Sequence, residues 1–421
     1  MPNGLGVQIP PRANFLFMNF PAGLVKRIVE KTGTPVYIYS AQKILDNLGA
    51  YKKQFASLQP LFCYAMKANS NGAVARLLAR NGAGADVVSG GELYRALRAG
   101  FDPRKIIFSG VGKTAEELAY ALRSGILFIN VESFEELEAL ERAAAGLKLK
   151  APVSVRINPD VDPHTHKFIT TGKIGSKFGV AFKEAGRLYS FAKASRHLEP
   201  VGLHFHLGSQ IDSPEPYAKA LAAAANFIRR LEKDGVKLKY LDIGGGWGVK
   251  EGSEMLPPGI LARTVGPAVK ELGLALILEP GRSLVAAAGA LAVRTLYRKK
   301  SGPKNYVITD GAMNDLIRPA FYGARHPVIP LVRRRGKSVR FDIAGPVCES
   351  GDFLAQDVGL PVPLRGDILL VLSAGAYGFS MSSQYNSRPR AAEVLITGKN
   401  SWRVVRKRET YKDLVAGEIN V

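Results

Sequence analysis

A lysine stands directly after an apolar segment in the first quarter of the chain. Lys67 follows residues 61–66 in the run LFCYAMKAN, where a buried strand would end. A lysine drawn into apolar surroundings has a pKa below its usual value of about 10.4, and its neutral amine can form a Schiff base with a carbonyl compound. A solvated lysine at the end of a strand fits the same pattern. Position alone leaves both interpretations open.

Acidic and imidazole side chains end other apolar segments, among them Asp86, Glu279 and His206. A carboxylate that faces a ring nitrogen of a cofactor would keep that nitrogen protonated. For Glu279 a salt bridge with Arg282 is the simpler alternative. His206 could lie flat against an aromatic ring, and a hydrogen-bonded core histidine is its alternative. Because His204 lies two residues earlier on the same side of a strand, the pattern does not distinguish the two histidines.

A glycine run follows a further apolar segment. The run DIGGGWG contains Gly244, Gly245 and Gly246 between a predicted strand and the next helix. Successive backbone N–H groups can bind a phosphate there. The run is a weak signal by itself, and it does not match the dinucleotide-binding fingerprint. Ser209 in HLGS and Arg282 in EPGR could contact the same anion.

The two cysteines have different surroundings. Cys63 lies within the apolar run LFCYAM and is predicted to be a small buried side chain. Cys348 lies in GPVCESGD, among turn-forming residues and an acid. There a functional thiol and an ordinary one are equally compatible with the spacing. In a reducing compartment neither cysteine needs a disulfide partner.

Apolar, β-prone segments alternate with helix-length segments over the first two-thirds of the chain. Eight such segments cover residues 61–66, 85–88, 106–109, 127–131, 153–157, 201–206, 240–243 and 274–278. This alternation predicts a parallel sheet, and eight units predict a closed (β/α)₈ barrel over residues 36–280. The active site of such a barrel lies at the carboxyl ends of its strands, which is where the polar residues named above are expected.

After Gly281 the pattern changes to short β-prone segments separated by Gly, Pro and Asn turns. They predict an antiparallel β-domain over residues 281–421, and residues 1–35 are expected to join it. The fold class is therefore a TIM-type barrel with a C-terminal β-domain.

The composition is that of an ordinary globular protein, with 46% hydrophobic and 22% charged residues. No run of about 18 apolar residues occurs, and the N-terminus lacks a signal-peptide pattern, so a cytoplasmic protein without membrane contact is expected. The formal net charge is +22, but the basic residues are spread out and form no nucleic-acid motif. A basic surface that favours anionic ligands is the better interpretation, and no nucleic-acid partner is predicted.

Taken together, these segments resemble the fold-type III pyridoxal-phosphate decarboxylases, whose barrel is shared with alanine racemase. The resemblance extends from residue 33 to residue 395 and rests on ten motifs in order. They are FCYAMKAN, GADVVSGGEL, IIFSGVGKT, NPDVDPHTHKFITTGKIGSKFG, GLHFHLGSQI, LDIGGGWG, EPGR, GAMNDLIRPAFYGARH, GPVCESGD and SAGAYGFSMSSQYNSRPRAAEVL. The series is far more specific than any one motif. Trp247 departs from the smaller residues common after the glycine run.

The resemblance implies roles for the candidate residues. Lys67 would hold pyridoxal 5'-phosphate covalently, His206 would stack on its pyridine ring, and Glu279 would pair with the ring nitrogen. Cys348 would return a proton to the substrate carbon after CO₂ leaves. The remaining cofactor contacts would come from Asp86, Ser209, Gly244, Gly245, Gly246, Gly281, Arg282 and Tyr377.

The residue after Cys348 bears on the substrate. Ornithine and arginine decarboxylases of this superfamily carry Asp there, whereas this chain has Glu349, as diaminopimelate decarboxylases do. The resemblance therefore implies conversion of meso-diaminopimelate to L-lysine and CO₂, the last step of lysine biosynthesis by this pathway. Glu349 would accept the distal ammonium. The other substrate contacts would come from Arg282, Arg318, Tyr322 and Tyr377, because arginine suits a carboxylate.

The resemblance also implies an obligate homodimer in which Cys348 and Glu349 reach into the partner's barrel, and it implies no metal. One alternative is a related decarboxylase acting on another amino acid or on carboxynorspermidine; Glu349, Arg318 and Tyr322 argue against it. Another is a silent homologue that binds the cofactor as a regulator. The presence of both Lys67 and Cys348 argues against that role.

Overall fold

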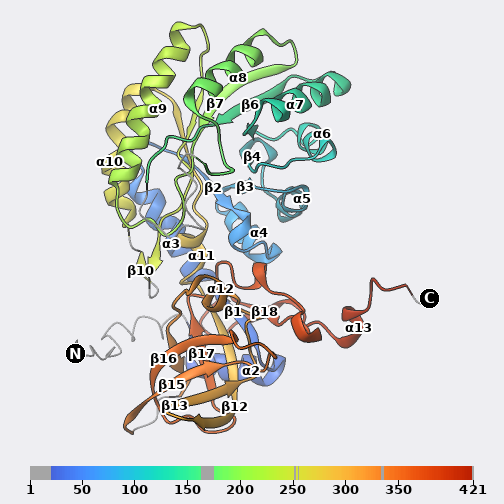
Figure 1. Cartoon of the computed structure of the whole chain (residues 1–421), viewed down its shortest axis with the longest axis vertical. Helices are drawn as coiled ribbons and strands as arrows, with labels where there is room; N and C mark the ends of the chain where they lie inside the picture. Colours follow the sequence, from blue (N-terminus) through green and yellow to red (C-terminus); the bar gives the residue numbers. More distant parts are fainter. Residues whose placement is uncertain (1–19, 163–174, 251–252, 255, 333–335, 420–421) are drawn as a thin grey trace. The chain divides into compact units, whose positions relative to one another are not determined.

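The computed structural model describes residues 20–162, 175–250, 253–254, 256–332 and 336–419 (Figure 1). Part of the motif that begins at Asn158, and residues 1–19 of the segment expected to join the β-domain, lie outside the described residues. The chain divides into two compact units. One comprises the described residues of Leu45–Lys250 and Glu254–Leu284, and the other comprises the remaining described residues. Among the described helices, none has the length and apolar character needed to cross a membrane.

Eight parallel strands close into a barrel in the first unit (Figure 1). Their order around the barrel is β11-β2-β3-β4-β5-β6-β7-β8. Each predicted segment contains one strand, with boundaries that differ by a few residues, so the barrel prediction is confirmed. The strands are β2 (Leu61–Ala65), β3 (Gly84–Val87), β4 (Ile106–Phe108), β5 (Phe128–Val131), β6 (Ala151–Arg156), β7 (Leu198–His204), β8 (Tyr240–Asp242) and β11 (Ala275–Leu278).

Helices connect successive strands, and polar caps fix where several of them begin. The Ser89 and Ser133 hydroxyls accept bonds from backbone N–H groups in the first turns of α5 and α7, and Thr114 forms a capping box at α6. The connecting helices are α4 (Gly72–Arg80), α5 (Gly90–Ala99), α6 (Ala115–Arg123), α7 (Phe134–Leu147), α8 (Phe182–Ala194), α9 (Glu215–Lys233) and α10 (Pro258–Leu272), while α3 (Ala41–Gln54) precedes β2 and α11 (Arg282–Val285) follows β11. The short strands β9 (Val249–Lys250) and β10 (Ser253–Glu254) precede α10.

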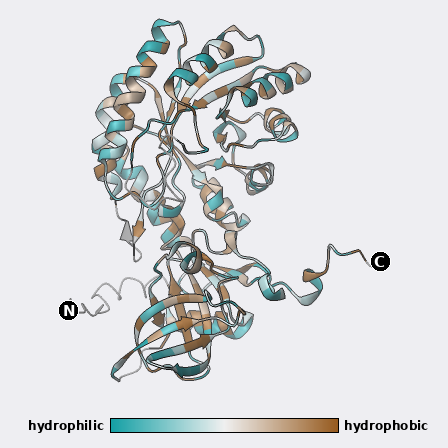
Figure 2. Cartoon of the chain, in the orientation of Figure 1, coloured by the Kyte–Doolittle hydropathy of each residue, from teal (hydrophilic) through white to brown (hydrophobic). Residues whose placement is uncertain are grey.

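Apolar side chains fill part of the barrel interior. One buried cluster joins Cys63, Ile107, Phe128, Val201 and Ile277. These residues come from strands that are not all neighbours in the sheet, so their contacts cross the barrel. Burial of the Cys63 side chain confirms the prediction made for it. Figure 2 shows hydrophobic colouring along the strands and mixed colouring along the helices, as expected where helices cover a buried sheet.

The second unit contains a nine-stranded sheet with the path β16-β15-β13-β12-β1-β18-β19, and β17 joins β12 to β14. Most pairs are antiparallel, but β1 pairs with β18 and β13 pairs with β15 in parallel, so the sheet is mixed. Strand β1 falls at the start of the region predicted as barrel, yet it pairs with β12 and β18. The strands are β1 (Val36–Ser40), β12 (Gly289–Ser301), β13 (Lys304–Thr309), β14 (Val328–Pro330), β15 (Ser338–Ala344), β16 (Phe353–Pro361), β17 (Ile368–Leu372), β18 (Ala392–Ile396) and β19 (Trp402–Arg406).

Helix α2 (Ala22–Thr32) packs its apolar face on this sheet. Leu24, Val25, Ile28 and Val29 belong to one buried cluster with residues of β1, β12, β17 and β18. The spacing of these four residues along the sequence puts them on one side of a helix. Two short helices, α12 (Arg318–Tyr322) and α13 (Tyr411–Leu414), complete the unit.

Candidate active site

Lys67 lies at the carboxyl end of β2, in a single turn of 3₁₀-helix. Its Nζ donates a hydrogen bond to Asp86 Oδ2 over 2.6 Å. Asp86 is fully buried near the end of the neighbouring strand β3, whereas about a third of the Lys67 side chain is exposed. The buried carboxylate therefore holds the amine at the mouth of the barrel, where it remains accessible.

Glu279 follows β11 and lies between two histidines. Its Oε1 is 3.4 Å from His204 Nε2, and its Oε2 is 3.7 Å from His206 Nδ1. Burial and the nearby charges of Asp242 and Asp86 raise the pKa of Glu279 well above its usual value. Burial, with a contribution from the Arg156 charge, lowers the pKa of both histidines well below 6.5. Both imidazoles are therefore neutral near pH 7.

The structure separates the two histidines that the sequence pattern left equivalent. The side chain of His204 is 1% exposed, whereas that of His206, beyond the end of β7, is 18% exposed. His206 Nδ1 accepts a hydrogen bond from the backbone N–H of Gly245 over 3.1 Å, which fixes this nitrogen without a proton. Of the two, His206 is the histidine that a ligand at the mouth can reach.

The glycine loop approaches neighbouring backbone too closely for side chains. A Cβ atom at Gly245 would lie 2.1 Å from the Glu279 carbonyl oxygen, and one at Gly246 would lie 2.1 Å from the Gly208 carbonyl oxygen. Gly244 and Gly246 also have positive φ angles, of 69° and 100°. The loop therefore requires glycine. The predicted anion contacts Ser209 and Arg282 lie together, because Arg282 donates to Ser209 Oγ over 3.1 Å.

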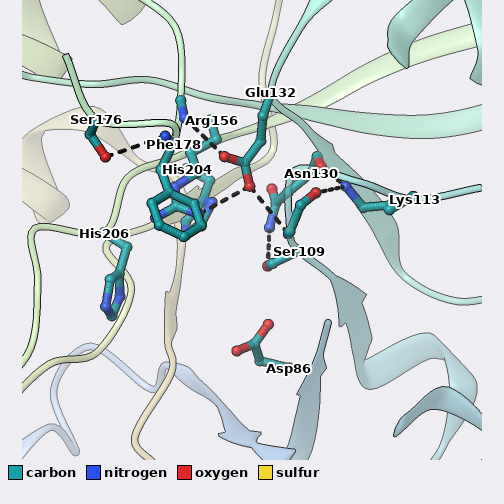
Figure 3. A network of polar contacts seen from close by, with 12 residues as sticks. Asp86, Ser109, Lys113, Asn130, Glu132, Arg156, Ser176, Phe178, His204 and His206 are labelled. Carbon is teal, nitrogen blue, oxygen red and sulfur yellow. Dashed lines mark hydrogen bonds and ion pairs between the residues drawn. The ribbon is translucent and has the colours of Figure 1, made fainter. Parts of the chain in front are cut away.

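A second polar network follows strands β4 to β6 (Figure 3). Glu132 Oε1 accepts bonds from Arg156 over 3.0 Å and from the Gly110 N–H over 3.2 Å, while its Oε2 accepts from the Gly179 N–H over 2.9 Å. The Arg156 guanidinium lies over the Phe178 ring, 4.7 Å from its centroid. Glu132 thus joins two loops to β6 at the carboxyl end of the barrel.

The remaining candidate residues lie in the second unit. Arg318 and Tyr322 are on α12, and Tyr377 follows β17 with a φ angle of 55°. The backbone N–H of Cys348 donates to Asn386 Oδ1 over 2.7 Å, and Tyr385 Oη donates to Glu349 Oε2 over 3.4 Å. Cys348 is exposed. The predicted site residues therefore form two groups, one in each unit.

Comparisons with known proteins agree with this geometry. Residues 41–286 match the family described as pyridoxal-dependent decarboxylase, pyridoxal binding domain. The diaminopimelate decarboxylase of Aquifex aeolicus is 46% identical over 400 residues, which cover 94% of this chain and 94% of that protein. That of Pseudomonas aeruginosa is 48% identical over 395 residues, which cover 94% and 95%. The crystal structure of the Helicobacter pylori diaminopimelate decarboxylase complexed with L-lysine has a TM-score of 0.90 at 43% identity, covering 93% of this chain and 98% of that one.

The chain belongs to the diaminopimelate decarboxylase family. The diaminopimelate decarboxylases are pyridoxal-dependent enzymes of lysine biosynthesis, so the predicted family, reaction and cofactor are confirmed. The decarboxylase fold is confirmed too, with the β-domain mixed rather than purely antiparallel.

The barrel residues suit the cofactor of a diaminopimelate decarboxylase. Pyridoxal phosphate needs an amine for its aldehyde, an acid for its ring nitrogen and N–H donors for its phosphate. Lys67, Glu279 and the glycine loop have the chemistry to supply these groups. Glu279 Oε1 and Asp242 Oδ2 are also buried and make no hydrogen bond with the described residues, which is unusual unless a ligand completes the site.

Sequence reasoning missed three residues of the decarboxylase site and its surroundings. Asp242 ends β8 and accepts a bond from the Gly244 N–H over 2.9 Å; its place before the glycine run could have revealed it. One side-chain oxygen or nitrogen atom from each of Asp242, His204 and Glu279 lies within 4.8 Å of the other two. Such a group could also hold a metal ion, although the sequence predicts none. His326 is the last residue of the motif GAMNDLIRPAFYGARH and Asn386 lies within SAGAYGFSMSSQYNSRPRAAEVL, but the sequence pattern singles out neither residue.

Proposed function

We propose that this chain catalyses decarboxylation of meso-diaminopimelate to L-lysine through the residues named from its sequence. The observation that carries the assignment is the Lys67 amine, held 2.6 Å from buried Asp86 at the mouth of the barrel. Pyridoxal phosphate, when bound, supplies the electron sink for the bond that loses CO₂. The protein residues bind and orient the two reactants and move a proton.

In this proposal Lys67 holds the cofactor and Asp86 keeps the amine in position. Glu279 would pair with the ring nitrogen of the cofactor, and His206 would stack on the ring. Neutral His206 suits that role, because a protonated imidazole would oppose the positive charge of a protonated ring. The phosphate is bound by the loop Gly244, Gly245 and Gly246, with Ser209, Gly281, Arg282 and Tyr377.

Substrate residues come from the second unit in this proposal. Arg318 binds the distal carboxylate with Arg282, Tyr322 and Tyr377, and Glu349 accepts the distal ammonium. Cys348 Sγ gives a proton to the carbon from which CO₂ departs. The exposed position of Cys348 in a single chain supports a homodimer in which Cys348 and Glu349 serve the partner's barrel. We also propose a cytoplasmic location, where two unpaired cysteines are ordinary.

The experiment is turnover of meso-diaminopimelate by the purified holoenzyme, with L-lysine and CO₂ measured together. Parallel reactions contain ornithine, arginine or lysine as the substrate. We expect equal amounts of L-lysine and CO₂ from diaminopimelate and little product from the other three, because only diaminopimelate satisfies both distal charges. Equal activity on ornithine would contradict the roles given to Arg318 and Glu349.

Mixed dimers test the shared site. Lys67→Ala and Cys348→Ala homodimers are expected to be nearly inactive. Mixing the two variants regenerates one site with both wild-type residues if Cys348 acts in the partner's barrel, and activity should rise toward a quarter of the wild-type value at random exchange. An unchanged low activity, after subunit exchange has been verified with tagged chains, would refute the shared site.

A further inference from the structure

A buried histidine joins Arg318 to the central part of the sheet in the second unit. His326 is 4% exposed. Its Nε2 lies 3.0 Å from an Arg318 guanidinium nitrogen, and its Nδ1 lies 2.9 Å from the Leu372 carbonyl oxygen. The imidazole therefore lies directly between the guanidinium and the end of β17.

These two contacts fix the protonation state of the ring. A carbonyl oxygen can only accept a hydrogen bond, so Nδ1 carries the hydrogen. A guanidinium can only donate, so Nε2 is the unprotonated nitrogen. His326 is consequently neutral in one tautomer, and its two nitrogens have opposite roles. A residue that lacks an acceptor at the Nε2 position could not hold Arg318 in the same way.

The backbone beside His326 is attached to the same residue as its ring. The N–H of Leu372 donates to the Pro327 carbonyl oxygen over 2.8 Å, while the carbonyl of Leu372 accepts from the ring. Leu372 ends strand β17, where it pairs with Ala290 of β12. The ring of His326 and the backbone of Pro327 are therefore each bonded to Leu372 of a paired strand, whereas α12, which carries Arg318, has only five residues.

We propose that His326 is a positioning residue that orients the Arg318 guanidinium for the carboxylate of the substrate. The inference rests on the proposed function, in which Arg318 binds the distal carboxylate. An arginine side chain loses considerable rotamer freedom when it is fixed, and a planar guanidinium must be aligned to bind a carboxylate through two N–H groups. The bond to His326 takes up one donor and sets that plane before the ligand arrives.

Two conservative variants separate the contacts of His326. In His326→Asn the amide can reach the Nδ1 position and keep the bond to Leu372, but it leaves nothing at the Nε2 position. In His326→Gln the amide oxygen reaches the Nε2 position and can accept from Arg318. The asparagine variant therefore tests the Arg318 contact with the sheet contact retained, and the glutamine variant tests rescue.

The readout is a pair of ligands that differ only in the carboxylate. L-Lysine and 1,5-diaminopentane are measured as inhibitors of the holoenzyme, and the ratio of their inhibition constants reports the carboxylate contact. We expect His326→Asn to raise the inhibition constant of L-lysine roughly tenfold, as for loss of a hydrogen bond to a charged group. The inhibition constant of diaminopentane should rise less than twofold. We expect His326→Gln to recover most of the loss. The KM for diaminopimelate should rise in parallel with kcat nearly unchanged.

Arg318→Met separates failure of this inference from failure of the proposed function. If Arg318→Met abolishes the preference for L-lysine and His326→Asn leaves it intact, Arg318 binds the carboxylate without help from His326 and the inference is wrong. If Arg318→Met leaves the preference intact, the role given to Arg318 is wrong. In the Arg318→Met background, His326→Asn should have no further effect on the ratio of the two inhibition constants. If His326→Asn changed this ratio as much there as in the wild-type enzyme, the inference would also be wrong. The absorbance of bound cofactor verifies that each variant is folded.

Discussion

The buried ion pair Glu132–Arg156 allows a direct test of what stabilises the carboxyl end of the barrel. Only 2% of the Glu132 side chain and 7% of the Arg156 side chain are exposed. The carboxylate accepts three hydrogen bonds, two on Oε1 and one on Oε2. In Glu132→Gln, only one oxygen remains, the new NH₂ group meets an N–H donor, and the Arg156 charge stays buried without its counter-ion.

We expect Glu132→Gln to lower the free energy of unfolding by about 3 kcal/mol, the lower end of the range for a buried ion pair that loses one partner. For a barrel of this size, that corresponds to a fall of roughly 6–12 °C in the thermal midpoint. The assay is calorimetry of the purified enzyme at one fixed cofactor concentration. Glu232→Gln, which removes the same charge from an exposed position at the end of α9, is the matched control and should shift the midpoint little. A fall no larger than that of the control would refute the reasoning.

Three further predictions concern the proposed site. Lys67→Ala should abolish the absorbance band of covalently held cofactor, whereas Lys183→Ala, at an exposed position of α8, should retain it; a persistent band in Lys67→Ala would require another amine. Cys348→Ala should lower kcat by about 10²–10⁴-fold, the usual contribution of a general acid, with little change in cofactor affinity; near-wild-type turnover would require another proton donor. Burial raises the pKa of Asp242 to about 8. Its ionisation should therefore destabilise the cofactor-free barrel progressively as pH rises from about 4 to 8. Asp242→Asn should stabilise that barrel at pH 8 and not at pH 4, as measured by urea unfolding, and an equal effect at both pH values would contradict this assignment.

The strands of the barrel could be predicted because each is a short apolar segment between helix-length segments. The same reasoning could not assign β1, whose five residues are all buried and which pairs with β12 and β18 in the other sheet. A strand buried on both faces has the same pattern in either sheet. Its partner β18 lies more than 350 residues later, and local sequence does not encode such a pairing.

Trp247 shows a similar limit. The sequence marks it as a departure from the smaller residues common after the glycine run, without indicating where its side chain lies. In the structure the indole is 1% exposed, and its ring centroid lies 5.3 Å from that of Tyr51, a residue of α3. The side chain is therefore part of the packing between helix and barrel. Position next to a functional loop does not reveal which way a large side chain points.

The buried acids at the barrel mouth are unfavourable for folding alone, so their presence needs another explanation. Asp86, Asp242 and Glu279 are all buried, and the described residues supply Asp242 Oδ2 and Glu279 Oε1 with no hydrogen bond. Neutral His204 and His206 contribute no balancing charge, so burial raises the pKa values of Asp242 and Glu279. The barrel residues alone therefore favour a proton on this pair of acids. A protonated ring nitrogen beside Glu279 would supply both a hydrogen-bond donor and the missing positive charge. If Glu279 binds the ring as proposed, a cationic ring would offset the unfavourable burial of these acids, as expected of a site selected for function rather than stability.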